Sequence, residues 1–138
     1  MTGKNAKIGG GGFHHISMHV QDLGKSIAFY TEGLGFELAF SWGTPERRTV
    51  LLDTGDGNYL ELSQGPTDGF NANGVVRHFA FRTNDCDKAI EAARAAGAEV
   101  TVETKAVTLP SEPPMPIRVA FFKGPDGEIV EFFEDDVT

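Results

Sequence analysis

The feature that most constrains the fold of this chain is an internal duplication. Aligned without a gap, residues 13–30 and 76–93 match at four chemically distinctive positions: His15 with His78, Asp22 with Asp85, Lys25 with Lys88 and Ile27 with Ile90. Farther along, DGNYLEL and DGEIVEF match as a turn followed by a strand, which aligns Glu61 with Glu131. Such a repeat predicts two similar modules, neither large enough to bury its own sheet alone.

Hydrophobic periodicity gives each module the order strand, helix, strand, strand, strand. In the first module Asp22 is a good N-cap for a helix that the glycines at 33 and 35 would end. In the second, Asp85 caps a helix that ends at Gly97. The strands are expected at 13–20, 36–42, 47–53 and 58–64, and then at 75–83, 98–104, 117–123 and 128–134. The fold class is therefore α+β, with two tandem βαβββ modules.

The rest of the chain divides around these modules. Residues 1–12 contain four consecutive glycines and are expected to form a flexible tail. The first module then covers 13–64, a linker rich in Gly and Asn covers 65–74, and the second module covers 75–138. The Pro-rich segment 109–116 is expected outside the sheet, because proline cannot donate to a strand ladder, and we interpret it as a lid over a cavity.

Strand alternation indicates which side chains share a face of each sheet. His15, Ser17 and His19 point one way, and Ile16, Met18 and Val20 point the other way, towards the helix. In the second module the polar and phenylalanine side chains alternate in the same manner. Polar inner faces are unusual for a small domain unless they enclose a cavity. A concave mixed sheet around a metal cavity is the simplest arrangement.

Charge and composition exclude several classes of function. The net charge of −8 makes nucleic acid an unsuitable partner, because phosphate binding needs a basic surface. The same charge disfavours an anionic membrane surface, and no apolar run approaches the length of a membrane span. A single cysteine, Cys86, cannot form an internal disulfide, which predicts a cytoplasmic protein with an inert thiol.

The duplication also predicts a metal site. Modules related by a pseudo-twofold axis bring equivalent positions together, so His15, Glu61, His78 and Glu131 are expected to converge as two imidazoles and two carboxylates. This mixed N/O set suits one divalent ion of Ni, Co, Zn, Mn or Fe. Such an ion acts as a Lewis acid in proton abstraction next to a carbonyl, and either glutamate could serve as the base.

Four segments, HHISMHVQDLGKSIAFYTEGLGF, YLELSQ, RHFAFRTNDCDKAI and GPDGEIVEFFE, together resemble the vicinal oxygen chelate superfamily of glyoxalases, epimerases, dioxygenases and antibiotic-resistance proteins. The resemblance covers residues 13–134 and implies metal ligands at the same four positions. It is closest to glyoxalase I, which implies a lyase or isomerase acting on a hemithioacetal of methylglyoxal and a thiol. The expected substrate contacts are His19, Arg82, Tyr59, Ser17 and Phe133.

One departure bears on the substrate. Glutathione-dependent members commonly carry an Arg where this chain has His19, and a basic loop where it has the acidic PSEPPMP. Three alternatives stay open: an epimerase, an iron-dependent extradiol dioxygenase, and a non-catalytic protein that binds a small molecule or antibiotic. The fourth ligand, Glu61, argues against the dioxygenase. A homodimer is expected, with each site built from one chain or from two.

Overall fold

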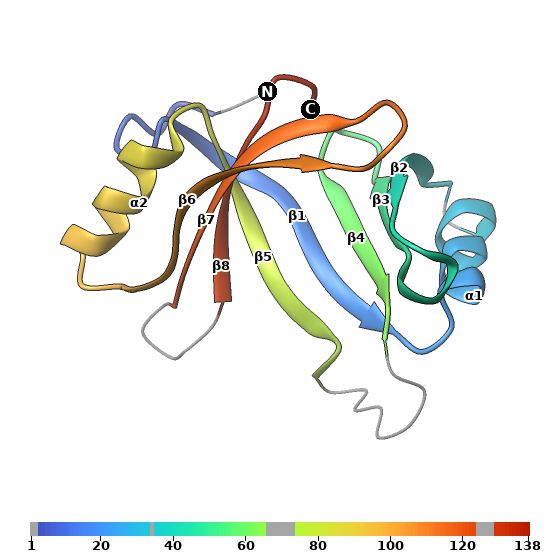
Figure 1. The fold of residues 1–138 in the computed structure, drawn as a ribbon. Helices are drawn as coiled ribbons and strands as arrows, with labels where there is room; N and C mark the ends of the chain where they lie inside the picture. Colours follow the sequence, from blue (N-terminus) through green and yellow to red (C-terminus); the bar gives the residue numbers. More distant parts are fainter. Residues whose placement is uncertain (1–2, 34, 66–73, 124–128) are drawn as a thin grey trace. The chain divides into compact units, whose positions relative to one another are not determined.

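The computed structural model describes residues 3–33, 35–65, 74–123 and 129–138 (Figure 1). Its helices and strands follow the order predicted by the repeat. The elements are β1 (Gly10–Val20), α1 (Leu23–Ala28), β2 (Glu37–Trp42), β3 (Thr49–Asp53), β4 (Tyr59–Gln64), β5 (Val76–Thr83), α2 (Cys86–Ala95), β6 (Glu99–Leu109), β7 (Met115–Lys123) and β8 (Ile129–Glu134). This is βαβββ twice, so the predicted fold class is confirmed.

The chain divides into two compact units that largely follow the two repeats. The first-half unit contains His15–Arg77 together with Pro110–Pro113. The second-half unit contains Met1–His14, His78–Leu109 and Pro114–Thr138. Strand β1 therefore changes units between His14 and His15, and each unit is described by itself below.

The first-half unit has the strand order β2-β3-β4-β1. Strands β1 and β4 run parallel, and β3 is antiparallel to both of its neighbours, β2 and β4. The parallel pair sets His15 opposite Tyr59 and Ser17 opposite Glu61. The first and last strands of the module thus lie side by side, which brings the histidine and the glutamate of this repeat onto adjacent strands.

The second-half unit repeats this arrangement with the order β5-β8-β7-β6. Strands β5 and β8 run parallel, with Ala80 opposite Glu131. The long strands β6 and β7 form an antiparallel hairpin, and β7 is antiparallel to β8. His78 on β5 and Glu131 on β8 therefore again occupy the first and last strands of their module.

The helix caps are repeat-equivalent, as the sequence predicts. Asp22 accepts a hydrogen bond from the backbone N–H of Lys25 at 3.1 Å, and Asp85 accepts one from Lys88 at 3.0 Å. Each bond satisfies an N–H that the first helical turn leaves without a partner. The two helices differ in length. Helix α1 has 6 residues and continues as a π-helical turn, Phe29–Gly33, whereas α2 has 10 residues.

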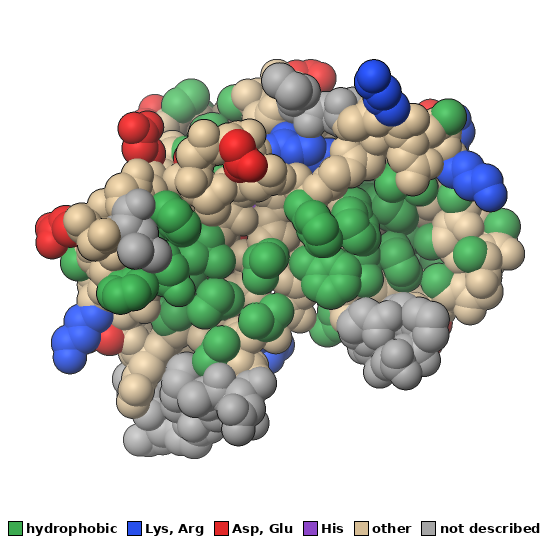
Figure 2. Space-filling model, turned by 180° about the vertical axis from the view of Figure 1, so that it is seen from behind, with side chains coloured by type: hydrophobic (Ala, Val, Ile, Leu, Met, Phe, Trp, Pro, Cys, Tyr) green, Lys and Arg blue, Asp and Glu red, His purple; other side chains and the backbone are tan. Residues whose placement is uncertain are grey.

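Hydrophobic side chains gather into patches on the face of the molecule that Figure 2 shows, with charged side chains mostly around them. Several large apolar residues are more than half exposed, among them Phe13, Phe29, Val76 and Val137. In the described parts of the chain, each unit contains a cluster of buried apolar side chains. Both clusters lie between a helix and its sheet, as the alternation of the strands predicts.

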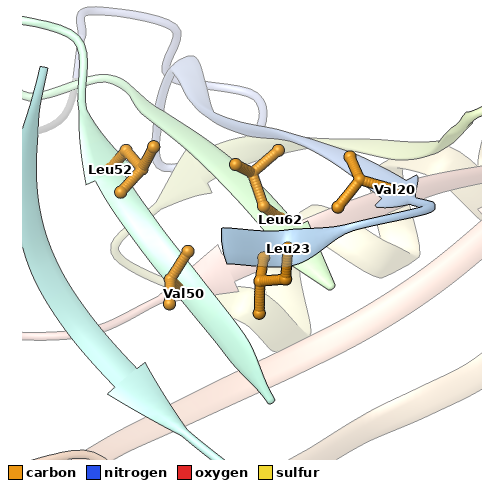
Figure 3. Close-up of a cluster of buried hydrophobic side chains, with 5 residues drawn as sticks. All are labelled: Val20, Leu23, Val50, Leu52 and Leu62. Carbon is orange, nitrogen blue, oxygen red and sulfur yellow. The ribbon is translucent and has the colours of Figure 1, made fainter. Parts of the chain in front are cut away.

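The core of the first-half unit is built from Val20, Leu23, Val50, Leu52 and Leu62 (Figure 3). Val50, Leu52 and Leu62 are completely buried, and Met18, Ile27 and Tyr30 pack against them from β1 and the helical segment. Leu62 follows Glu61 directly on β4, so the two side chains point to opposite faces of the strand. Packing of the apolar face thus fixes the direction of the glutamate.

The core of the second-half unit is the counterpart of this cluster. Cys86, Ala89 and Ile90 from α2 pack against Ala120 of β7 and Phe132 of β8. Phe81 of β5 joins the cluster from the face opposite to His78 and Arg82. Phe132 lies next to Glu131, so the carboxylate again points away from the core. The same packing rule therefore orients the glutamate in both units.

The N-terminal segment differs from its expectation. Gly10, Gly11 and Gly12 were assigned to a flexible tail, but they form the start of β1. Gly9 to Gly12 all have positive φ, between 73° and 128°, a conformation that only glycine adopts without strain. The Asn84 backbone N–H donates to Gly9, which ties this segment to the second-half unit. The glycines permit this path instead of disorder.

The Pro-rich segment also differs in part. Strand β6 extends to Leu109 and β7 begins at Met115, so Thr108 pairs with Pro116 inside the hairpin. Pro116 occupies the second residue of its strand, where a missing N–H costs least. Most of the predicted linker 65–74 and the turn at 124–127 lie outside the described residues. No helix in the described parts of the chain has the length and apolar character needed to cross a membrane.

Candidate metal centre

The first-half unit places His15 beside Glu61. Strand β1 carries the histidine and the parallel strand β4 carries the glutamate, and Nε2 of His15 lies 3.7 Å from Oε2 of Glu61. His15 is almost completely buried. The other carboxylate oxygen, Oε1, accepts a hydrogen bond of 2.8 Å from the hydroxyl of Ser17. Both oxygens of Glu61 thus lie close to side chains of β1.

The second-half unit contains the repeat-equivalent pair. Nε2 of His78 on β5 lies 3.0 Å from Oε2 of Glu131 on β8. Glu131 is buried, and the ring of Phe121 on β7 meets the His78 ring edge-on, with the ring centres 5.8 Å apart. Phe121 thus places one apolar contact beside the pair, and the His78 side chain keeps 18% of its surface exposed. Each unit therefore offers one imidazole nitrogen and one carboxylate oxygen in close approach.

These separations fit a metal-ligand role. Two ligand atoms bound to one ion at about 2.1 Å are about 3.0 Å apart at a right angle and about 3.4 Å apart at the tetrahedral angle. The observed 3.0 Å and 3.7 Å bracket this range. The same separations also fit a pair between a protonated imidazole and a carboxylate. The donor chemistry, neutral nitrogen with anionic oxygen, suits a first-row divalent ion.

Two of the expected substrate contacts are engaged within the protein. The Nε of Arg82 donates to the backbone carbonyl of Phe13 at 3.1 Å, and its Nη1 lies 3.4 Å from the hydroxyl of Thr138. Phe133 is buried and stacks on His14, with the ring centres 3.8 Å apart. Both side chains therefore help to build the second-half unit, whatever contact with substrate they also make.

The remaining expected contacts lie on the strands of the first-half unit. Tyr59 is opposite His15, and His19, which shares the face of β1 that carries His15, is opposite Ser63. Tyr59 and His19 are half-buried. Ser17 is buried and directs its hydroxyl to Glu61, a partner that the sequence did not identify. The parallel pairing of β1 with β4 is what creates this contact.

His14 is buried in the second-half unit, which the alternation of β1 alone does not predict. It is completely buried, although the neighbouring His15 is buried too, and its Nε2 lies 2.7 Å from the hydroxyl of Thr138. Two consecutive buried residues interrupt the inward and outward alternation of β1 at the point where the strand passes between units. The stacked His14 and Phe133 rings thus complete the second-half unit near its strand β8.

Two further features of the second-half unit do not involve its His–Glu pair. A cavity of about 850 Å³ in the second-half unit is lined by the N-terminal segment, the end of α2 and Phe122 and Phe132, mostly apolar groups. Neither His78 nor Glu131 lines it. Cys86 is buried in the core, and this burial raises the pKa of its thiol to about 11. The thiol is thus protonated at neutral pH, as expected of an inert cysteine.

Known proteins resemble this chain over the residues that form the two repeats. Residues 12–132 match the family described as the glyoxalase/bleomycin resistance protein/dioxygenase superfamily. YwbC of Bacillus subtilis is 32% identical over 124 residues, covering 87% of this chain and 94% of that protein. The lactoylglutathione lyase of Haemophilus influenzae is 32% identical over 130 residues, covering 90% of this chain and 93% of that protein.

Among solved structures, a variant of the Streptomyces coelicolor methylmalonyl-CoA epimerase in complex with 2-nitronate-propionyl-CoA superimposes with a TM-score of 0.67. It is 27% identical, and the match covers 91% of this chain and 97% of that one. The family match spans both repeats and both His–Glu pairs. The chain therefore belongs to the glyoxalase/bleomycin resistance protein/dioxygenase superfamily.

Proposed function

We propose that this protein is a divalent-metal-dependent lyase or isomerase that removes a proton from a carbon next to a carbonyl in a small substrate with vicinal oxygens. One ion would be shared by His15, His78 and Glu131, whose ligand atoms all lie within 4.8 Å of one another. Glu61, which approaches His15, would be the fourth ligand. The observation that carries the proposal is the presence of a His–Glu pair at the equivalent position of each repeat.

Repeat equivalence strengthens this assignment beyond what a single pair could. A lone histidine beside a glutamate is more often an ordinary ion pair than a metal site. Here the same pair recurs on the first and last strands of both modules, while the core residues behind it also correspond. Glu61 enters the ligand set through its 3.7 Å approach to His15. Two neutral imidazoles and two carboxylates balance the charge of one divalent ion.

The residues of the chain then have distinct tasks. The two imidazoles bind through Nε2, the atom that faces the glutamate in each unit. One glutamate takes the proton from the substrate carbon, and we leave this role open between Glu61 and Glu131. The metal would supply Lewis acidity at the substrate oxygens. The ring of Phe121 meets the His78 ring edge-on and would help to hold the imidazole in place.

We propose a hemithioacetal of methylglyoxal and a thiol as the first substrate class. Support comes from the lactoylglutathione lyase of Haemophilus influenzae and its similarity over most of both chains. The segment PSEPPMP is acidic, and His19 stands where glutathione-dependent members commonly carry an arginine. We therefore expect glutathione, which carries two carboxylates, to be a poor thiol. A thiol with fewer negative charges is favoured.

A methylmalonyl-CoA type epimerase is the second candidate. It is favoured by the 27% identity and 0.67 TM-score to the Streptomyces coelicolor epimerase. Both reactions would begin with proton removal next to a carbonyl by one glutamate. They differ in where a proton returns, which is the neighbouring carbon in hemithioacetal isomerisation and the opposite face of the same carbon in epimerisation. The dioxygenase and the non-catalytic binding protein remain alternatives that the following assay also addresses.

The test is an activity panel on metal-loaded protein. Apo protein is reloaded separately with Ni, Co, Zn, Mn or Fe and assayed with methylglyoxal plus several thiols, with a methylmalonyl thioester, and with catechols under oxygen. The proposal predicts turnover of a hemithioacetal or a thioester that is lost in Glu61→Gln and Glu131→Gln. Oxygen uptake with a catechol, or binding of an antibiotic without turnover of any substrate, would contradict it.

We also propose a homodimer in the cytoplasm. The dimer is supported by the exposure of large apolar side chains, including Phe13 and Phe29, which an assembly would cover. The compartment is supported by the use of a single, buried cysteine, Cys86. Light scattering at several protein concentrations tests the first expectation, and fractionation of the source cells tests the second.

A further inference from the structure

The hydroxyl of Ser17 has a specific partner in the first-half unit. It donates to Oε1 of Glu61 at 2.8 Å, while Oε2 of the same carboxylate is the atom that approaches Nε2 of His15. Ser17 is 3% exposed, so water does not compete freely for this bond. A serine hydroxyl has only one proton to donate, and here that proton is used on the carboxylate.

The backbone register makes this contact local and well determined. Ser17 and Glu61 are direct partners across the parallel strands β1 and β4. Leu62, the next residue of β4, is completely buried in the core, so Glu61 lies on the opposite face of the strand. The position of the hydroxyl relative to Glu61 is therefore set by two packed strands and not by a surface loop.

The second repeat has no hydroxyl at the position equivalent to Ser17. The residue equivalent to Ser17 is Ala80, which lies opposite Glu131 in the same register on strands β5 and β8. A methyl group cannot donate a hydrogen bond, so this position offers Glu131 nothing comparable. The hydroxyl is thus a property of one half of the site, and the duplication itself does not account for it.

We infer that Ser17 is a positioning residue for Glu61, which rests on the metal site proposed above. By occupying Oε1, its hydroxyl leaves Oε2 as the single ligand atom of Glu61 and keeps the carboxylate monodentate. Hydrogen bonds to ligating carboxylates orient the ligand, and their removal typically weakens metal affinity by about 10-fold to 100-fold. Ser17 therefore acts through Glu61.

The experiment compares Ser17→Ala and Ser17→Thr with the wild type and with Ser63→Ala as a matched control. Ser63 lies on β4 two residues after Glu61, and its hydroxyl bonds to Thr49 at 2.9 Å, away from the carboxylate. Apo protein is titrated with Co²⁺ against a competing chelator to give Kd, and the visible absorption spectrum reports the ligand geometry. Circular dichroism and the thermal midpoint of each apo variant check folding.

We expect Ser17→Ala to raise the Kd for Co²⁺ about 10-fold or more and to change the visible spectrum, while Ser63→Ala leaves both unchanged. Ser17→Thr keeps the hydroxyl and restores the wild-type spectrum. An unchanged Kd and spectrum in folded Ser17→Ala would overturn the inference, as would equal weakening in the alanine and threonine variants. If the wild type does not bind Co²⁺, or His15→Ala binds it equally well, the metal site itself fails.

Discussion

Replacing Leu62 and replacing Glu61 should have opposite consequences, although the two residues are neighbours on β4. Leu62 is completely buried among Val20, Leu23 and Val50 on the helix-facing side of the sheet (Figure 3). Glu61 points to the other face, where it contacts Ser17 and His15. We expect Leu62→Ala to lower folding stability without changing metal binding, and Glu61→Gln to do the reverse.

The size of the Leu62 effect follows from its burial. Truncation to Ala removes three carbon groups worth about 0.8 kcal/mol each, or roughly 2.4 kcal/mol of transfer free energy. The cavity that remains raises the expected loss to about 3–4 kcal/mol of unfolding free energy. For a domain of this size the thermal midpoint should fall by roughly 10–15 °C. Glu61→Gln conserves the side-chain volume, so the apo variant should stay within about 1 kcal/mol of the wild type.

The assay is thermal unfolding of each protein without metal and with Co²⁺ at about 100 times the wild-type Kd. Binding to the native state alone then stabilises the wild type by about 2.7 kcal/mol, and Leu62→Ala should retain this increment. Glu61→Gln should lose most of it, because a site weakened about 100-fold contributes only about 0.4 kcal/mol at the same concentration. Equal increments in all three proteins, or a Leu62→Ala loss below about 1 kcal/mol, would refute the reasoning.

Three further outcomes test the local structure. Asp85→Ala removes the side chain that accepts a hydrogen bond from the Lys88 N–H at the start of α2. It should lower the unfolding free energy, measured by urea denaturation, by about 1 kcal/mol, and no loss would argue against the cap. Cys86 should resist a thiol reagent at about pH 8 in the folded protein and react rapidly in urea, because burial raises its pKa from 9.0 to about 11. Rapid labelling of the folded protein would contradict the burial. Because the pKa of the thiol is higher in the folded than in the unfolded protein, its contribution to stability is complete below about pH 9 and is lost as the pH rises towards 11. The urea midpoint should therefore fall over that interval.

The sequence predicted the elements whose signals are local or repeated. The caps at Asp22 and Asp85, the alternation that turns Met18 and Val20 towards the core of the first-half unit, and the order of the strands all come from periodicity and helix-start signals. The structure confirms these elements, with boundaries shifted by a few residues. From the pseudo-twofold relation of the repeats, the sequence also predicted that His15 and Glu61 converge with their repeat equivalents, His78 and Glu131.

Other features depend on contacts that periodicity does not encode. The glycine run at 9–12 forms the start of β1 because positive φ angles allow its path beside Asn84. The β6–β7 hairpin continues to Pro116 because antiparallel pairing tolerates a proline near the start of a strand. The burial of His14 depends on stacking with Phe133, which is distant in sequence. The bond from Ser17 to Glu61 depends on the register of two parallel strands.

The central claim is that the two halves of the chain share one divalent ion. The most direct measurement is the metal stoichiometry of apo protein reloaded with Co²⁺, compared in the wild type, His15→Ala and His78→Ala. We predict one ion per chain in the wild type and loss of that same ion in either variant, although the two histidines belong to different repeats. Two ions per chain, each removed by only one of the substitutions, or no bound ion in the wild type, would contradict the account.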